Sequence, residues 1–422
     1  MPTPRAKLRR SGRSWAAVVL AASIATSCTG GSDEVAPTTT VVVTTTTLPE
    51  RTGDGVLSIG VFLPRTGPGA SLGEPMIEAI EDAVQLINDA GGALGNDVEL
   101  TTIDEESDTG PDELLAAGVD AVIGPASSLV ALSRLDALVR LDTGVVTCSP
   151  SATALSLDDY PDNSYFFRTV PSDSLQMAAI ASRIEQTGVD TVAIAYLDDP
   201  YGRGLEAALV SELQARDAVS IVEQVGFSGD EENLSDAANT LLTGTPGAVV
   251  VLGDADDGSR LLAALDDAPR RTPSAIIVND AIREARQTIQ NLSPSFRVRL
   301  TAVAPLATSV IDDGPTGFFA AHAVDCVNLV SLAAIQAGSD APNRVRANMA
   351  SVSTGGRVCS DYARCVELLE DEDGLRIDYN GLSGSVDLSN TTGDPVRATF
   401  EAIAFDAQGA DDPAATRRFD VP

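Results

Sequence analysis

The chain has very few of the side chains on which most enzyme and metal sites depend. Its 422 residues include one histidine, one tryptophan and five cysteines, and its one lysine is Lys7. A Walker phosphate loop needs a lysine that the rest of the chain does not have. The single histidine, His322, and the spacing of the cysteines do not provide a zinc site. We therefore expect no cofactor and no metal.

The nucleophile motif of the serine hydrolases is also missing. Residues 381–385 (GLSGS) come nearest to GxSxG, but a serine stands where the last glycine is required. A Ser-His-Asp site would have to use His322, and apolar spacing predicts a core-facing helix over 316–337, where a histidine is expected to be structural. We expect a protein that is not an enzyme, and keep a hydrolase only as a third hypothesis.

Basic residues are scarce compared with acidic ones, at 28 against 61, for a net charge of −33. Residues 1–27 contain five of the 28 basic residues and none of the acidic ones. The rest of the chain therefore has 23 basic residues against 61 acidic ones. Such a balance argues against nucleic acid and anionic lipid headgroups as partners. It is typical of a soluble, self-repelling surface.

The amino terminus reads as an export signal. Arginines and Lys7 precede a short apolar stretch from Trp15 to Ala25, and small residues lead to Cys28. This arrangement predicts a lipoprotein signal over 1–27, with Cys28 lipid-modified at the outer face of the cell membrane. An ordinary signal peptide cut near Ser27, with Cys28 incidental, is the alternative. The Thr/Pro-rich segment 28–52 then reads as a tether. No apolar run is long enough to span a membrane.

Four further cysteines suggest disulfides in an exported chain. Cys359 and Cys365 are close in a polar segment, and we expect them to form a small closed loop. Cys148 and Cys326 either form a second bridge or remain two buried thiols.

Strand and helix patterns alternate along the rest of the chain, which predicts an α/β fold with parallel sheets covered by helices. Roughly 370 residues exceed what one core usually holds, so two lobes are expected. The tail differs, since 384–388 and 398–405 resemble two antiparallel strands joined through 390–394. Elsewhere the pattern predicts strands at 98–102, 121–123, 144–147, 191–196, 218–224, 248–252 and 275–278, and helices at 174–186, 202–214, 231–242, 259–266 and 316–337.

The clearest local pattern covers residues 57–92. A buried strand over 57–63 leads through a glycine-rich turn into an amphipathic helix that ends at Gly91 and Gly92. We expect Pro75 in the first turn of that helix, where its missing N–H is tolerated. An open turn between a strand and a helix lies at the carboxyl edge of a parallel sheet, where α/β proteins bind ligands.

This segment resembles the start of the Leu/Ile/Val-binding proteins, the branched-chain amino-acid substrate-binding family of ABC transporters with the periplasmic binding protein type I fold. The resemblance extends over about 55–410 through short motifs, found at Thr66-Gly67-Pro68, 87–92, 123–125, 149–153, 167–169, 201–202 and 381–388. It implies two Rossmann-like lobes with parallel central sheets, joined by a three-strand hinge that crosses near Pro171, near Pro305 and over 355–380. The lobes would be 53–170 plus 306–355 and 171–305 plus 380–410, with 356–379 as a hinge-region segment.

The resemblance also implies where a ligand binds. Loops after two strands would hold the carboxylate and part of the ammonium group of an amino acid, through Ser127 or Ser128, Ser151, Ala152 and Thr153. Hydroxyls and backbone N–H groups at helix starts suit a carboxylate. The alternative is that these residues only cap helices.

The opposite wall would come from the second lobe. Tyr201 matches a cleft tyrosine of the family, Asp254 lies where an aromatic residue is frequent, and Asp280 lies near an acidic residue that pairs with the ammonium group. For Asp280, a helix cap is the alternative. Leu72 stands where the branched-chain binders carry an aromatic side chain, so the ligand pocket is expected to have a different shape.

These features together predict a monomeric, lipid-anchored solute-binding protein that closes around an amino acid or a related compound and delivers it to an ABC permease. A ligand sensor or regulatory subunit with the same fold is the second hypothesis.

Overall fold

The computed structural model describes residues 51–67, 69–230, 234–269, 273–306, 315–371 and 376–422. The expected signal segment 1–27, the lipidation site Cys28 and nearly all of the tether lie outside these residues. They therefore stay predictions.

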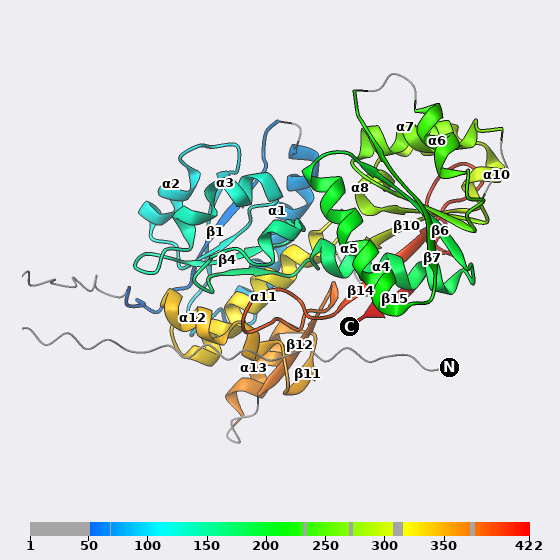
Figure 1. Cartoon of the computed structure of the whole chain (residues 1–422). Helices are drawn as coiled ribbons and strands as arrows, with labels where there is room; N and C mark the ends of the chain where they lie inside the picture. Colours follow the sequence, from blue (N-terminus) through cyan, green and yellow to red (C-terminus); the bar gives the residue numbers. More distant parts are fainter. Residues whose placement is uncertain (1–50, 68, 231–233, 270–272, 307–314, 372–375) are drawn as a thin grey trace, which may run out of the picture. The chain divides into compact units, whose positions relative to one another are not determined.

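The first sheet has five parallel strands in the order β2-β1-β3-β4-β5. β3 and β4 are buried throughout, as expected of central strands that helices cover on both faces. Figure 1 shows this part in blue to teal. Its strands are β1 (Ser58–Leu63), β2 (Glu99–Asp104), β3 (Ala121–Ile123), β4 (Val146–Ser149) and β5 (Phe166–Arg168), and its helices are α1 (Ala70–Asp89), α2 (Gly110–Ala117), α3 (Ser128–Leu138) and the 3-10 turn η1 (Leu155–Leu157).

The start of α1 corrects one expectation. Pro75 lies inside the helix, because α1 begins five residues earlier than expected, at Ala70. The N–H groups of Leu72 and Gly73 both bond to the carbonyl of Gly69 at 3.0 Å, so the helix is already established before the proline. Gly73 permits this path, since a Cβ there would lie 1.9 Å from the carbonyl oxygen of Pro64.

The second sheet has seven strands in the order β15-β14-β10-β9-β8-β6-β7. The strands from β10 to β7 are parallel to their neighbours, whereas β14 and β15 add an antiparallel edge. The strands are β6 (Thr191–Leu197), β7 (Ser220–Phe227), β8 (Ala248–Leu252), β9 (Ala275–Asn279), β10 (Leu300–Pro305), β14 (Ala398–Ala404) and β15 (Arg417–Val421), and the helices are α4 (Asp173–Gln186), α5 (Pro200–Arg216), α6 (Ser235–Leu241), α7 (Ala255–Asp266), α8 (Asp280–Arg283), α9 (Arg286–Asn291) and α10 (Pro294–Arg297).

A third, small sheet corrects the expected tail hairpin. β13 (Gly384–Ser385) pairs antiparallel with β12 (Ile377–Gly381), which in turn pairs parallel with β11 (Arg357–Cys359). The expected partner, β14, instead pairs with β10 and β15. A single bridge between Leu388 and Pro395 is the only trace of the hairpin in the described residues. Alternation along the tail identified the strands, but their partners come from other parts of the chain.

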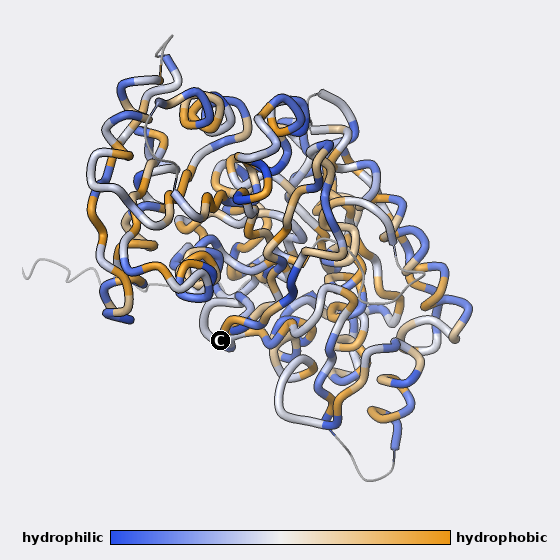
Figure 2. The backbone as a smooth tube through the Cα atoms, turned by 90° about the vertical axis from the view of Figure 1, so that its right-hand side faces the viewer, coloured by the Kyte–Doolittle hydropathy of each residue, from blue (hydrophilic) through white to orange (hydrophobic). Residues whose placement is uncertain are grey.

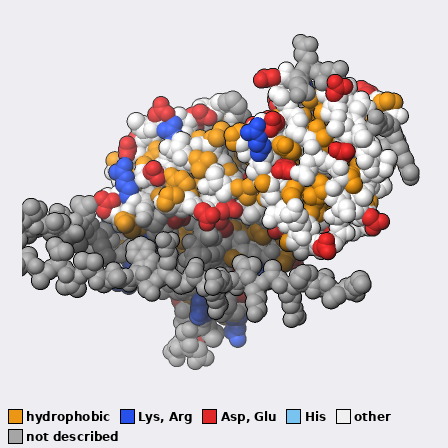
Figure 3. Space-filling model, in the orientation of Figure 1, with side chains coloured by type: hydrophobic (Ala, Val, Ile, Leu, Met, Phe, Trp, Pro, Cys, Tyr) orange, Lys and Arg blue, Asp and Glu red, His pale blue; other side chains and the backbone are white. Residues whose placement is uncertain are grey.

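Helix α11 (Ala320–Ala337) is the longest buried helix of the first core and begins four residues later than expected. This corrects the expectation that no apolar run is long enough to span a membrane, since α11 alone among the described helices has the necessary length and apolar composition. Most of it, however, is buried in this core. Hydrophobic and hydrophilic stretches alternate along the outer helices in Figure 2, and Figure 3 shows acidic side chains scattered over the visible face with few basic ones.

The remaining elements are α12 (Pro342–Asn348), η2 (Ala350–Val352) and α13 (Tyr362–Glu370).

The cysteines pair as Cys148–Cys326 and Cys359–Cys365, with Cα separations of 5.8 and 5.5 Å. The first pair joins β4 to α11 across 178 residues of sequence. It therefore holds a core helix against the strand that leads into one of the expected ligand loops.

The hydrophobic cores bear on how the chain is divided. One core takes residues from 57–170, from 319–352 and from 359–388, whereas two further clusters cover the faces of the second sheet. The first core thus includes residues 377–388, which the sequence assigned to the hinge-region segment and the second lobe. The division into two lobes joined by three crossings stays a proposal.

Candidate functional site

The expected ligand residues of the first sheet lie in two loops that are tied together. Ser127 caps α3, with its Oγ accepting from the N–H of Val130 at 3.4 Å. Ser128 Oγ accepts from the N–H of Ala154 at 3.2 Å, and Ser151 Oγ donates to the carbonyl of Ala126 at 3.0 Å. The loop after β3 and the loop after β4 therefore form one polar surface at the carboxyl edge of the sheet.

Thr153 joins this surface to the start of α4. Its carbonyl accepts from the N–H of Asp173 at 2.9 Å, and its side chain partly offsets the rise that burial causes in the pKa of the Asp173 carboxylate. Asp173 is 2 % exposed, and its Oδ2 has no hydrogen-bond partner in the described part of the chain. A buried carboxylate oxygen without a donor is costly, so this atom marks a place where a ligand donor could bind.

Residues of the second sheet supply a matching group. Tyr201 stands in the first turn of α5, after β6, and its hydroxyl accepts from Nδ2 of Asn279 at 3.3 Å. Asn279 ends β9 and also bonds to the carbonyl of Gly253 at 3.0 Å, which fixes its amide. Asp280 follows directly and is buried, and the side chain of Gln176 partly offsets the rise that burial causes in the pKa of Asp280.

The two carboxylates and the tyrosine influence one another. Burial raises the pKa of Asp173 well above its usual range, and the charge of Asp280 raises it further. Burial likewise raises the pKa of Asp280. The pKa of Tyr201 is raised well above its usual value by burial and by the charges of Asp173 and Asp280. Two acids held in one low-dielectric place disfavour their charged forms, and a cation between them would reverse this effect.

Several backbone donors that sequence reasoning assigned to a ligand already have partners. Glu105 follows β2 and accepts from the N–H groups of Ala126 at 2.6 Å and Ser127 at 3.3 Å. Ser149 Oγ accepts from the N–H groups of Ser151 at 3.4 Å and Ala152 at 3.0 Å. The N–H of Thr153 has no acceptor within the described residues, so it remains available to a ligand carboxylate.

A backbone hydrogen bond ties Thr153 to Asp173, and the charges of Asp173 and Asp280 both raise the pKa of Tyr201. Sequence reasoning missed Asp173. Asp254 is exposed and caps α7 by accepting from the N–H of Asp257 at 2.8 Å. Leu72 lies in the first turn of α1, partly buried against the first core. Asp173 could have been found from the sequence, because it is an acidic residue that stands just before the expected helix 174–186. It also follows closely after the motif at 167–169.

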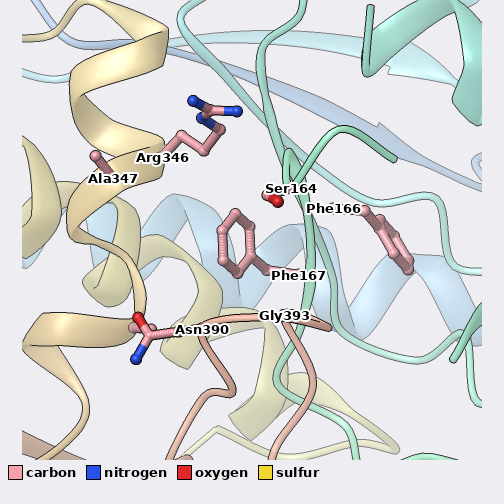
Figure 4. Close-up of a pocket in the computed structure, with 8 residues that line it drawn as sticks. Ser164, Phe166, Phe167, Arg346, Ala347, Asn390 and Gly393 are labelled. Atoms are coloured by element: carbon pink, nitrogen blue, oxygen red, sulfur yellow. The ribbon is translucent and has the colours of Figure 1, made fainter. Parts of the chain in front are cut away.

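Two cavities of the described structure lie away from this cluster. One, of about 210 Å³, lies beside β5 and is lined by Phe167, Arg346 and Gly393 among others; Figure 4 shows the Phe167 ring between these two. A groove of about 820 Å³ runs along α1, α11 and α13. Neither includes a residue of the expected site. We take the buried carboxylates as the candidate site, because Oδ2 of Asp173 is a buried polar atom without a partner in the described part of the chain.

His322 is buried in α11, and its Nδ1 lies 3.2 Å from the carbonyl oxygen of Thr169. Burial lowers the pKa of His322 to about 4. Its contact is with backbone rather than with a serine hydroxyl, so the geometry does not assemble a hydrolase site. No cluster of three potential metal ligands occurs in the described part of the chain.

Comparison with known families gives a match over more than half of the chain. The profile of the family described as periplasmic binding protein matches residues 56–277. That range includes the expected ligand residues from Leu72 to Asp254 and ends three residues before Asp280.

Individual relatives share about a quarter to a third of their residues with this chain. A chemotactic signal transduction system substrate-binding protein, BasB of Halobacterium salinarum, is 27 % identical over 79 % of this chain and 83 % of its own length. The Leu/Ile/Val-binding protein BraC3 of Rhizobium johnstonii is 29 % identical over 42 % of this chain and 49 % of its own length.

Solved structures share the fold. The branched-chain amino acid transporter substrate-binding protein LivJ of Streptococcus pneumoniae, in complex with isoleucine, matches with a TM-score of 0.62 at 20 % identity and covers 86 % of this chain and 99 % of its own. The leucine-binding protein LivK of Thermotoga maritima matches with a TM-score of 0.62 at 17 % identity, over 85 % and 98 %. A solute-binding protein of R. palustris in complex with benzoate matches with a TM-score of 0.59 at 17 % identity, over 86 % and 96 %.

Proposed function

Because the chain belongs to the periplasmic binding protein family, in its branched-chain amino-acid type I group, we propose that it is an extracytoplasmic solute-binding protein for a small zwitterion. The ligand is an amino acid or a related compound with one ammonium and one carboxylate group. The protein performs no chemistry on it.

The observation that carries this proposal is the pair of buried carboxylates, Asp173 and Asp280, with one oxygen of Asp173 left without a partner and with both charges acting on Tyr201. An ammonium group placed there gains two charged acceptors and relieves the repulsion between them. A ligand with only a carboxylate, such as benzoate, would instead add a third negative charge. The site therefore favours ligands that carry a cation.

The other end of the ligand is assigned to the first-sheet loops. The Thr153 N–H is available, and the hydroxyl hydrogens of Ser127 and Ser128 can donate, because the oxygens of both hydroxyls accept hydrogen bonds from backbone N–H groups. Ser151 and Ala152 position this loop through Ser149 and Ala126. Asp254 and Leu72 belong to the rim of the proposed site.

The mechanism is hinge closure of the two proposed lobes, in which water is excluded as Tyr201 and Asp280 meet the ligand held by Thr153. The lipid on Cys28 keeps the monomeric protein at the outer face of the membrane, where it delivers the ligand to an ABC permease. The two cysteine pairs would be oxidised in that compartment.

Sensing is the second candidate function, and one observation favours it. BasB, which matches over 79 % of this chain, is named as a substrate-binding protein of chemotactic signal transduction. The same closed form would then be read by a membrane receptor instead of a permease. Neighbouring permease and ATPase genes would favour transport, and a receptor or kinase gene would favour sensing.

A thermal-shift screen of the mature chain tests the proposal. Amino acids, amides, short peptides and simple carboxylates are each added in large excess. A ligand at a hundredfold excess over its dissociation constant stabilises the folded state by about 2.7 kcal/mol. Shifts confined to compounds with an ammonium group are expected. Shifts with carboxylates alone, or with no compound of the screen, would contradict the proposal.

A further inference from the structure

We propose that Arg168 is a positioning residue that couples the ligand loop after β4 to the turn 389–395, through which the chain passes into the second sheet. The effect on ligand affinity rests on the proposed function, whereas the coupling itself does not. Arg168 ends β5 and is fully buried.

The Arg168 side chain holds the ligand loop from behind. Its Nη1 donates to the carbonyl oxygens of Ala152 and Ala154, each at 3.3 Å. These two residues flank Thr153, whose N–H and hydroxyl face the proposed ligand. Planar guanidinium donors fix the direction of both carbonyls, so they also fix the orientation of the peptides 152–153 and 154–155 on either side of Thr153.

The same guanidinium is neutralised by carboxylates from two other segments. Nη2 pairs with Asp158 at 2.7 Å and Nε pairs with Asp394 at 2.6 Å. Asp158 also accepts from Ser172 Oγ at 2.6 Å, and Ser172 caps α4 immediately before Asp173. One buried cation thus connects the ligand loop, the start of α4 and the turn 389–395.

The turn is attached to Arg168 by its backbone as well. The N–H of Arg168, on the free edge of β5, donates to the carbonyl of Gly393 at 3.1 Å. Gly393 has a φ of +72°, and a Cβ there would lie 2.1 Å from the carbonyl oxygen of Phe166, so the turn lies directly against the strand. Figure 4 shows Gly393 close to Phe167 of the same strand.

The chain leaves this turn directly for the second sheet. β14 begins at Ala398, four residues after Asp394, and pairs with β10. A buried ion pair cannot be stretched cheaply, because an uncompensated charge would be left in the core. Movement of the segment before β14 is therefore transmitted through Asp394 and Arg168 to the peptides at 152–154.

The test compares Asp394→Ala with Glu401→Ala in the purified full-length protein. Glu401, on β14, is a matched control, since it pairs with Arg418 of β15 at 3.0 Å. Its exposed fraction of 7 % equals that of Asp394. Hydrogen exchange of the amides of Ala152 and Ala154, which bond to Ser149 and Ser128, is followed without ligand. Asp394→Asn keeps an acceptor for Arg168 and serves as the milder variant if Asp394→Ala does not fold.

We expect exchange at Ala152 and Ala154 to accelerate at least tenfold in Asp394→Ala, less in Asp394→Asn, and not in Glu401→Ala. Ligand affinity should fall about tenfold in Asp394→Ala and stay unchanged in Glu401→Ala. Wild-type protection of both amides in the Asp394 variants, or equal acceleration in Glu401→Ala, would overturn the coupling. If the wild type binds no zwitterion, the proposed function fails, while the exchange result still decides the coupling.

Discussion

The carbonyl of Thr153 accepts the N–H of Asp173 at 2.9 Å, and the Thr153 side chain partly offsets the raised pKa of the Asp173 carboxylate. The two residues belong to different elements, the loop after β4 and the first turn of α4. A ligand that binds Thr153 therefore also lies within reach of a buried carboxylate. The predictions below concern this pair, its surroundings and the elements that hold it in place.

Asp173→Asn and Asp280→Asn should each weaken the binding of ligands that carry an ammonium group. Each removes one charged acceptor, which corresponds to about 1.5–3 kcal/mol, or tenfold or more in affinity. Binding of an analogue without the ammonium group should change little. Calorimetry with both ligands measures the difference, and Asp361→Asn, at the N-cap of α13, controls for the loss of a charge. An equal loss of affinity for both ligands would show that the ammonium group does not bind at these carboxylates.

Thr153→Val should weaken the binding of the amino-acid ligand while the N–H of residue 153 is retained. The loss of a hydroxyl that bonds to a charged group corresponds to about 1–3 kcal/mol. Thr187→Val is the control, since the Thr187 hydroxyl donates to the carbonyl of Ile184 at the end of α4 and is remote from the site. Unchanged affinity in Thr153→Val, measured by calorimetry, would exclude the hydroxyl from the site.

Glu105 should make the stability of the protein depend on pH. Burial raises its pKa from 4.5 to about 7, against the two N–H groups that lower it. The folded state thus favours the protonated form. The protonated Glu105 stabilises the folded state fully below pH 4.5, and this contribution is lost as pH rises through 7. The free energy of unfolding should then fall by on the order of 3 kcal/mol. Urea unfolding at several pH values should show this decline for the wild type relative to Glu105→Gln. Parallel curves for the two proteins would contradict it.

The two cysteine pairs should differ in their contribution to stability. Cys148–Cys326 closes a sequence separation of 178 residues and Cys359–Cys365 one of 6. Loss of loop entropy in the unfolded chain then corresponds to about 5 kcal/mol for the first pair and about 2 kcal/mol for the second. Double Cys→Ala variants compared by chemical denaturation under oxidising conditions measure this. A larger loss for the short loop would show that the entropy of the unfolded chain is not the main effect.

Much of the fold was accessible from the sequence, because its signals are local. The strand over 248–252 and the alternation of strands and helices over 98–305 follow from apolar periodicity within each segment. The start of α1 was missed because Pro75 is a strong local signal that the hydrogen bonds of Gly69 override. The tail hairpin was wrong because a strand pattern does not identify the partner strand.

The sequence by itself determined the class of protein: α/β alternation, family motifs in the correct order, and the scarcity of histidine and lysine all result from the order of residues along the chain. Only the tertiary structure decided which side chains meet. It brought Asp173 to Thr153 and Asp280, occupied the N–H groups of Ala126 and Ser127 with Glu105, and placed Arg168 between Asp158 and Asp394. These contacts join residues from 10 to 226 positions apart. Burial, which sets their charge and their free energy, is a property of the packed chain and not of any one segment.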